Sequence, residues 1–509
     1  MGTSLSIASI LLFLWLAQKL LIILTSGTRA PYPPGPKPLP VIGNVLELPL
    51  RNAARTYLEW GRRYNSDLIH ASALGQHILV INSREDADAL FEQRSRKYSD
   101  RPASPIVKLM GWEFNMGLLG YGEAWRFHRK LAQQNFGREA AEKYHAVATK
   151  KVHEMLRNLL ATPGRFRDHY KMFSISFPMA AMYGYDVKSF EDPCVVAAQR
   201  SLNLGVYLLL PGSSYISILP ILKYIPPWFP GASSRRMAAE VSSFTAEMIR
   251  IPMEFVRKRV DEGTAEPSLV SDFLEKQKSA GASAKEGEAI SNVANTVYSA
   301  ASDTTTSATG TFFYLMAINP DVQRKAQAEI EKVIGSRRLP TLKDRASLPY
   351  IEAIYREVMR FHPPVPLNIP HALSEDDYYK GYFIPKGTTV LGNIWAMTHD
   401  EKAYPEPFEF KPERFFDENG ELNGDDRILA YGFGRRICVG KHIASSVMWL
   451  IMASVLACFD ISKAKDEFGN EIEVNGEYED FGLVTHKAKF KCYFVPRSPV
   501  TEELVSNTK

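Results

Sequence analysis

The sequence predicts a mainly α protein with a small β region, an α+β arrangement built as one large domain behind a short apolar N-terminal segment. Three observations predict this class. Helical apolar spacing runs through most of the 509-residue chain, strand-like alternation is confined to short blocks, and no Ser/Gly-rich or charge-block linker divides the chain after residue 45. Hydrophobic residues make up 45% of the chain, which is enough for a large core.

The N-terminal segment predicts a membrane anchor followed by a hinge. Residues 5–24 are largely apolar over about the length that spans a bilayer, so we expect a transmembrane anchor in residues 1–28. Basic residues occur late in this run and after it but not before it, which places the main domain in the cytosol by the positive-inside rule. A cleaved signal peptide is the alternative. Residues 29–45 are dense in proline and predict a stiff, extended hinge, which leaves residues 46–509 as the main domain.

Charge and cysteine usage exclude several classes of protein. The formal net charge of +4 is small and no run of five or six basic residues occurs, so we expect no nucleic-acid partner. The four cysteines, at 194, 438, 458 and 492, lie far apart and indicate no disulfide framework. The sequence also contains no Asn-x-Ser/Thr acceptor site. These features favour a reducing, cytosolic environment.

Short β segments are expected near both ends of the main domain. Residues 67–74 and 76–82 are rich in β-branched residues and flank a turn at Gly75, which predicts a hairpin. Residues 378–391 contain two Lys-Gly turn pairs between strand-like runs, and residues 487–495 alternate as a strand does.

Helices should fill the region between these blocks. The clearest case begins with Asn319 as N-cap and Pro320 at the first helical position, and Gly335 ends it. Residues 294–316 also have helical spacing, although their centre is crowded with Ser and Thr, which are indifferent helix formers. Residues 442–459 are apolar without a Pro or Gly.

The most informative chemistry lies immediately before that last helix, in residues 431–440, YGFGRRICVG. Unpaired N–H groups and the helix dipole stabilise negative charge at a helix N-terminus, so we expect the Cys438 thiol to ionise more easily than a free one. A soft thiolate favours iron or copper. The glycines leave room for a flat ring against the backbone, and Arg436 offers a fork of donors to a carboxylate. The segment therefore suits a haem with propionates.

Other interpretations of this segment are weaker. A lone cysteine is most often a small buried hydrophobe, and a Gly-rich turn before a helix can bind phosphate. However, Ile437 stands where the dinucleotide pattern needs its third glycine. Zinc is disfavoured because no second cysteine lies at finger spacing.

The same residues resemble the haem-binding signature of the cytochrome P-450 family, Phe-x-x-Gly-x-Arg-x-Cys-x-Gly. Gly434, Arg436, Cys438 and Gly440 match it, and Tyr431 stands where the family usually has Phe. The resemblance implies the cytochrome P-450 fold, with Cys438 as axial ligand of the iron of haem b.

A second motif lies in the Ser/Thr-rich helix. Asp303 and Thr304, beside Ala300 and Ala301, resemble the family's (Ala/Gly)-Gly-x-(Asp/Glu)-Thr oxygen-activation motif, with Ala301 in place of the glycine. An acid and an alcohol together can relay protons to bound dioxygen. The alternative is that these hydroxyls only bond back to helix carbonyls.

Glu357 and Arg360 lie three residues apart on one helix face and can pair, with Arg414 as a second guanidinium if the pair is buried. This spacing resembles the family's Glu-x-x-Arg motif and its Pro-Glu-Arg-Phe segment, which imply a structural triad behind the haem. Trp125 and Arg129 lie one helical turn apart and resemble the family's Trp-x-x-x-Arg, which grips a haem propionate.

His371 resembles a further propionate-binding position, although a lone histidine is more often a packed core or surface residue. The four motifs occur in family order. They imply a fungal microsomal, class II haem-thiolate monooxygenase in which Asp303 and Thr304 deliver protons. Its expected partners are NADPH-cytochrome P-450 reductase, cytochrome b5 and a lipophilic substrate, such as a terpenoid or polyketide intermediate of secondary metabolism.

The resemblance further implies single-pass anchoring in the endoplasmic reticulum membrane, with the catalytic domain on the cytosolic face. Residues 224–232 place Trp228 and Phe229 among prolines and suit a substrate entrance at the membrane surface. Two alternative functions are a haem-thiolate isomerase or dehydratase that needs no external electrons, and a non-enzymatic haem sensor.

Overall fold

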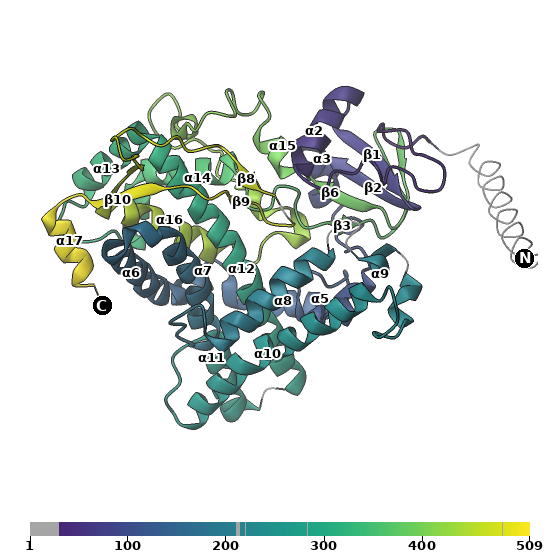
Figure 1. Cartoon of the computed structure of the whole chain (residues 1–509), viewed down its shortest axis with the longest axis horizontal. Helices are drawn as coiled ribbons and strands as arrows, with labels where there is room; N and C mark the ends of the chain where they lie inside the picture. Colours follow the sequence, from purple (N-terminus) through teal and green to yellow (C-terminus); the bar gives the residue numbers. More distant parts are fainter. Residues whose placement is uncertain (1–29, 210–213, 219, 282, 481, 509) are drawn as a thin grey trace, which may run out of the picture.

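Helices dominate the computed structural model, which describes residues 30–509 apart from 210–213, 219, 282, 481 and 509 (Figure 1). The helices that precede the long central one are α2 (Ala53–Tyr64), α3 (Arg84–Ala87), α4 (Pro105–Leu109), α5 (Glu123–Phe136), α6 (His145–Ala161), α7 (Phe166–Tyr183), α8 (Pro193–Leu209), α9 (Tyr215–Ile218), α10 (Ser233–Asp261) and α11 (Leu269–Ala280). The others are α12 (Ala284–Ile318), α13 (Pro320–Val333), α14 (Pro349–Phe361), α15 (Ile394–Thr398), α16 (Lys441–Cys458) and α17 (Pro499–Ser506).

The β structure is small and divided among four sheets. Its strands are β1 (Leu68–Ala73), β2 (Gln76–Ile81), β3 (His371–Ala372), β4 (Asp377–Tyr379), β5 (Tyr382–Ile384), β6 (Thr389–Gly392), β7 (Phe459–Lys463), β8 (Tyr478–Glu479), β9 (His486–Lys487) and β10 (Cys492–Pro496). The largest sheet has the order β1-β2-β6-β3, with β2 and β6 parallel and the other pairs antiparallel. Figure 1 shows this sheet beside α2, away from the body of helices. The pairs β7–β10, β4–β5 and β8–β9 are each antiparallel.

The core forms around α12, which contacts α5, α7, α14 and α16. The apolar half of α12 is fully enclosed, with Phe312 and Phe313 at 0% exposure. The second core helix, α16, is apolar on all sides because protein surrounds it, and Trp449 within it is also 0% exposed. In the described part of the chain, α16 alone is long and apolar enough to cross a membrane, but its burial marks it as a core helix.

Most elements expected from the sequence are present, and the mainly α class is confirmed. The expected hairpin forms as β1 and β2, with Gly75 at φ 84° in its turn. Asn319 is the N-cap residue of α13, as expected, although its side chain donates to the Leu315 carbonyl of the preceding helix and accepts no hydrogen bond from the new one. The expected anchor in residues 1–28 lies outside the described residues.

Candidate active site

Cys438 lies in the loop that leads into α16, three residues before the helix begins. Its backbone N–H donates to the Tyr431 carbonyl at 2.8 Å, which closes the loop around the thiol. Gly440 is the N-cap of α16, and its N–H donates to the Cys438 sulfur. The ten-residue motif therefore folds into one turn that presents the sulfur.

Two glycines shape this turn. Gly434 has φ 55°, and a Cβ at this position would lie 2.0 Å from the Phe91 carbonyl oxygen. Gly432 has φ 78° and ψ −159°, a combination essentially restricted to glycine. Without side chains here, the turn packs closely on η1 (Asp88–Gln93), a π-helix, and the Gly434 N–H donates to Glu92 at 2.7 Å.

The Cys438 thiol combines exposure with close surroundings. It is the exposed member of the four cysteines, whereas the other three are buried. Nevertheless, burial raises the pKa of the Cys438 thiol, and the Gly440 N–H, Arg129 and Lys441 oppose this shift. The expectation that the thiol ionises more easily than a free one is therefore wrong for the polypeptide alone, because desolvation outweighs the nearby positive groups.

Tyr431 stands where the family signature usually has Phe, and its additional hydroxyl is accommodated by a partner. Its hydroxyl lies 2.9 Å from the hydroxyl of Tyr355 on α14, so the additional polar group has a partner. Burial holds the pKa of Tyr431 well above its ordinary value. This contact ties the cysteine loop to α14.

Arg436 and Trp125 lie together beside the loop. The guanidinium carbon of Arg436 is 4.4 Å from the centre of the Trp125 ring, a cation–π arrangement. Arg436 donates to the carbonyls of Ser99 and Leu119 at 2.7 and 2.8 Å, so backbone oxygens already accept from part of its guanidinium group. Burial lowers the pKa of Arg436 to about 10.

Arg129, on the same helix as Trp125, has an unmatched donor. Its Nε is buried without a hydrogen-bond partner in the structure. Burial lowers the pKa of Arg129, and the proximity of Cys438 opposes that shift. A buried guanidinium donor without an acceptor is costly, which indicates that an anionic group belongs next to it.

Arg101 is a site residue that the sequence motifs did not identify. It is 8% exposed and donates to the carbonyls of Gly117, Ile369 and Pro370 at 2.7, 2.9 and 2.7 Å. Burial holds its pKa well below the ordinary value, and the charge of Arg436 lowers it further. No short motif marks Arg101 in the sequence, because its partners come from segments far along the chain.

His371, on β3, completes this group. It is 2% exposed, its Nδ1 lies 2.6 Å from the Tyr98 carbonyl, and its ring packs on Phe91 at 4.6 Å. Burial holds the pKa of His371 well below its ordinary value, and Arg101 and Arg436 lower it further. The Tyr98 carbonyl requires that Nδ1 carries a hydrogen.

The cluster of Arg101, Arg129, Arg436 and His371 fits a haem. Within the described residues, none of the three guanidinium groups forms an ion pair with a carboxylate. The cluster lies near a cysteine sulfur whose turn has glycines in place of side chains. Buried positive charge suits propionates, and an exposed thiol suits iron. In the described part of the chain, no group of three or more His, Cys, Asp or Glu side chains could hold a different metal.

The acid and alcohol of the second motif lie on α12 but do not contact each other. The Thr304 hydroxyl donates to the Ala300 carbonyl at 2.9 Å, one helical turn back. The Asp303 carboxylate lies 2.9 Å from Nε2 of His486 on β9. His486 was not identified from the sequence, because 182 intervening residues separate two groups that β9 brings together.

Glu357, Arg360 and Arg414 meet in a buried ion-pair cluster. Glu357 is 0% exposed, and its carboxylate accepts from Arg360 at 2.6 and 2.8 Å and from Arg414 at 3.1 Å. The backbone N–H of Lys411 donates to it at 2.9 Å. Arg360 also donates to the carbonyls of Thr398 and Pro407, so every charge in the cluster has partners.

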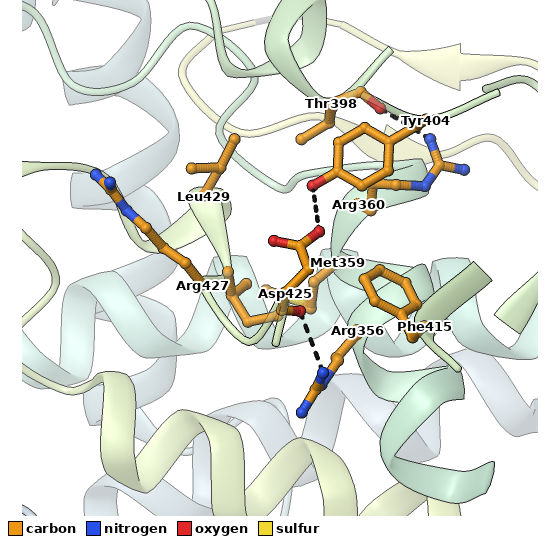
Figure 2. A pocket seen from close by; sticks show the side chains of 10 residues that line it. Arg356, Met359, Arg360, Thr398, Tyr404, Phe415, Asp425, Arg427 and Leu429 are labelled. Carbon is orange, nitrogen blue, oxygen red and sulfur yellow. Dashed lines mark hydrogen bonds between the residues drawn. The ribbon is translucent and has the colours of Figure 1, made fainter. Parts of the chain in front are cut away.

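A small polar pocket adjoins this cluster (Figure 2). Tyr404 donates to Asp425 at 2.8 Å across it, and Arg356 donates to the Asp425 carbonyl at 3.2 Å. The pocket thus lies in the scaffold that joins α14 to the segment before the cysteine loop, and it adds no reactive group.

An exposed thiol before a buried helix, beside guanidinium groups without carboxylate partners, defines a protein that holds an anionic, iron-bearing cofactor. The comparisons agree: the family model for cytochrome P-450 matches residues 33–492. The chain is 40% identical to the cytochrome P-450 monooxygenase COX2 of Coprinopsis cinerea over 484 residues, which cover 94% of this chain and 91% of that relative.

Two other relatives are similar over comparable lengths. The cytochrome P-450 monooxygenase claR of Ampulloclitocybe clavipes is 38% identical over 94% of this chain and 88% of its own length. The tryptamine 4-monooxygenase of Psilocybe cyanescens is 34% identical over 94% of this chain and 95% of its own length.

The chain belongs to the cytochrome P-450 family. It is an oxidoreductase of the monooxygenase class with a haem cofactor, as its motifs predicted.

Proposed function

We propose that this protein inserts one oxygen atom of dioxygen into a lipophilic small molecule, with haem b as cofactor and electrons from NADPH through NADPH-cytochrome P-450 reductase. The observation that carries this proposal is the exposed Cys438 thiol beside the unmatched donor of Arg129. When bound, the haem supplies the iron at which dioxygen is activated. The remaining roles belong to side chains of this chain.

Cys438 would hold the haem iron through its sulfur. The Gly440 N–H donates to the sulfur, which stabilises its negative charge, and the Cys438 N–H bond to Tyr431 keeps the loop closed. The propionates would lie among Arg129, Arg101, Arg436, Trp125 and His371. The three guanidinium groups would attract them, although the Asp100 carboxylate also acts on Arg101 and Arg436. Gly434 and Gly440 allow the close approach of a flat ring to the backbone.

The Glu357 cluster would hold the cysteine loop from behind. The cluster fixes α14 to the segment around Arg414, and α14 in turn contacts the loop through Tyr355 and Tyr431. In the described residues, no hydrogen bond joins the Glu357 cluster to the Cys438 sulfur or to the cluster of Arg101, Arg129, Arg436 and His371. The role of the Glu357 cluster would therefore be structural.

Asp303 and Thr304 would move protons on the other side of the haem. The Thr304 hydroxyl gives its hydrogen to the Ala300 carbonyl, which leaves its oxygen lone pairs available to accept from a bound ligand or water. The Asp303 carboxylate is half-exposed, so solvent reaches it. An acid and an alcohol that are adjacent on one helix and both open to solvent suit a relay.

The substrate would be apolar, such as a terpenoid or polyketide intermediate. An open pocket between residues 104 and 120 is lined in part by Trp112, Leu118 and Leu119, and the Leu119 carbonyl accepts from Arg436. Exposed Ile221, Tyr224 and Trp228, at 68%, 71% and 79%, support a substrate entrance at a membrane surface.

The remaining assignments are proposed from sequence and family. Residues 1–28 would anchor the protein in the endoplasmic reticulum membrane with a single pass, residues 29–45 would form the hinge, and residues 46–509 the catalytic domain on the cytosolic face. Cytochrome b5 would serve as a second electron donor. Nucleic acid is not an expected partner.

The spectrum of the reduced carbon monoxide complex provides the first test. The wild-type holoprotein should show the strongly red-shifted Soret band of thiolate ligation, and Cys438→Ser should lose that band while it remains folded by circular dichroism. Product formation with reductase, NADPH and a panel of terpene and polyketide precursors tests the reaction. Turnover without NADPH would favour the isomerase or dehydratase instead, and the absence of any turnover would favour a sensor.

A further inference from the structure

The β8–β9 hairpin holds His486 against Asp303. His486 pairs with Glu479 in the antiparallel register, and its Nε2 lies 2.9 Å from the Asp303 carboxylate on α12. The two side chains are 28% and 49% exposed. An ion pair this exposed contributes little to the free energy of unfolding, and holding both side chains in one geometry costs entropy. The pair therefore has little structural benefit.

The next residue, Lys487, helps to hold the hairpin in place. Lys487 is 3% exposed, and its ammonium lies 4.5 Å from the centre of the Tyr314 ring and 5.3 Å from that of Tyr478. It donates to the Glu477 carbonyl at 2.8 Å. Because Tyr314 lies on α12, its contact with Lys487 holds β9 beside the helix that also carries Asp303.

The residue before His486 is equally constrained. The Thr485 N–H donates to the Pro364 carbonyl at 3.0 Å, and its hydroxyl lies 2.8 Å from Nε2 of His362. The Ser307 hydroxyl, on α12 itself, donates to the Thr485 carbonyl. His486 is therefore fixed on both sides along the chain, and it is positioned relative to the helix that carries Asp303.

We propose that His486 is a positioning residue of the proton-delivery path, holding the Asp303 carboxylate on the solvent side of α12 and supplying it with protons taken from water. This inference rests on the proposed monooxygenase function. Asp303 and Thr304 are neighbours on a helix and so point about 100° apart. The Asp303 carboxylate and the Thr304 hydroxyl therefore lie on different faces of α12.

The transfer is balanced without any electron movement. The Nε2–H bond of the His486 imidazolium breaks, an O–H bond forms on Asp303, and the neutral ring regains a proton from water. The charged groups around His486 are Asp303 on α12, Glu479 across the hairpin and Lys487 next in sequence, with neutral His362 behind Thr485.

The first test needs no turnover. Ring ¹⁵N signals from histidine-labelled holoprotein, with that of His486 assigned by its loss in His486→Gln, report whether both ring nitrogens carry protons. At a fixed pH, the Nε2 signal of His486 should shift in Asp303→Asn, because the carboxylate 2.9 Å from that nitrogen is replaced by an amide. An unchanged Nε2 signal would overturn the pair.

The second test measures turnover. In His486→Gln, product formed per NADPH should fall about 10-fold, less than the roughly 10²–10⁴-fold of a direct acid–base group, because His486 acts through Asp303. Its turnover should also lose any wild-type rise at lower pH. Glu479→Gln is the matched control, since it removes a charge from the same hairpin without touching Asp303, and it should keep wild-type coupling. Wild-type coupling and pH profile in His486→Gln would overturn the proposal.

The two proposals can fail separately. If the reduced carbon monoxide complex lacks its red-shifted band, or no substrate consumes NADPH, the monooxygenase function fails while the ¹⁵N experiment still tests the pair. If the wild type turns over and His486→Gln matches it, the function holds and the role of His486 fails.

Discussion

The two sides of the proposed haem site are built in opposite ways. On the cysteine side, Glu357 at 0% exposure and Gly434 against the Phe91 carbonyl fix the loop through buried charge and backbone contact. On the α12 side, the reactive groups Asp303 and His486 are half-exposed and paired in solvent. Under the proposed function, rigidity would serve metal ligation, while access to water would serve proton movement. Substitutions on the cysteine side should cost stability, and those on the α12 side should mainly change coupling.

The largest expected loss of stability is at Glu357. Glu357→Ala leaves the buried Arg360 and Arg414 guanidinium groups without their carboxylate, which should cost about 3–5 kcal/mol and reduce haem incorporation. Chemical denaturation and the haem-to-protein absorbance ratio measure both effects. Glu254→Ala is the control, because it removes the same side chain from an exposed pair with Arg250 and should cost less than about 1 kcal/mol. Equal losses in the two variants would contradict the comparison.

Gly434→Ala should have the next largest effect. The new methyl group would meet the Phe91 carbonyl in a residue with φ 55°. Gly420→Ala introduces the same methyl at φ 77° where no atom lies within 4 Å, so it isolates the conformational cost. We expect Gly434→Ala to be less stable than Gly420→Ala by about 1–3 kcal/mol in thermal or chemical unfolding. A smaller penalty at Gly434 would show that the loop relaxes freely.

Tyr431→Phe restores the residue usual in the family and should have a small effect. It removes the hydroxyl contact with Tyr355, but Tyr355 keeps a hydrogen bond with Ser445. The loss should be about 1 kcal/mol or less. Unfolding of Tyr431→Phe, Tyr355→Phe and the double variant separates the pair from each ring, and a loss well above 2 kcal/mol would mean that the hydroxyls support the loop directly.

Thr304→Ala should leave stability almost unchanged. Its hydroxyl bonds only to the Ala300 carbonyl one turn back, and alanine is the better helix former. The expected change is instead in coupling, with NADPH consumed without a matching yield of product. Thr304→Ser keeps the hydroxyl and should retain coupling. If Thr304→Ala stays fully coupled, the hydroxyl does not belong to the proton path.

The motifs were predictable from sequence because their residues lie close along the chain. Trp125 and Arg129, and Glu357 and Arg360, lie three or four residues apart on a helix, where spacing alone places them on one face. Asp303 and Thr304 are adjacent in the chain, so their motif was visible although they point about 100° apart. Arg101 and His486 were missed. Their partners lie 16 or more residues away, and a single arginine or histidine carries no local signal.

The acidity of Cys438 was also out of reach of the sequence. The basic flanks and the following helix were visible, but the burial that raises the pKa of the thiol was not. Desolvation depends on how many atoms surround a group, and only the folded chain determines that number.

The sequence by itself determined the helical body, the hairpins, the thiolate loop and its family, since periodicity, glycine positions and short motifs are local properties. The tertiary structure decided which charges meet. It left a donor of Arg129 without a protein acceptor, enclosed Glu357 between two guanidinium groups, and placed His486 on Asp303. These contacts join distant segments, so packing alone decides whether a charge is paired, buried or open to water.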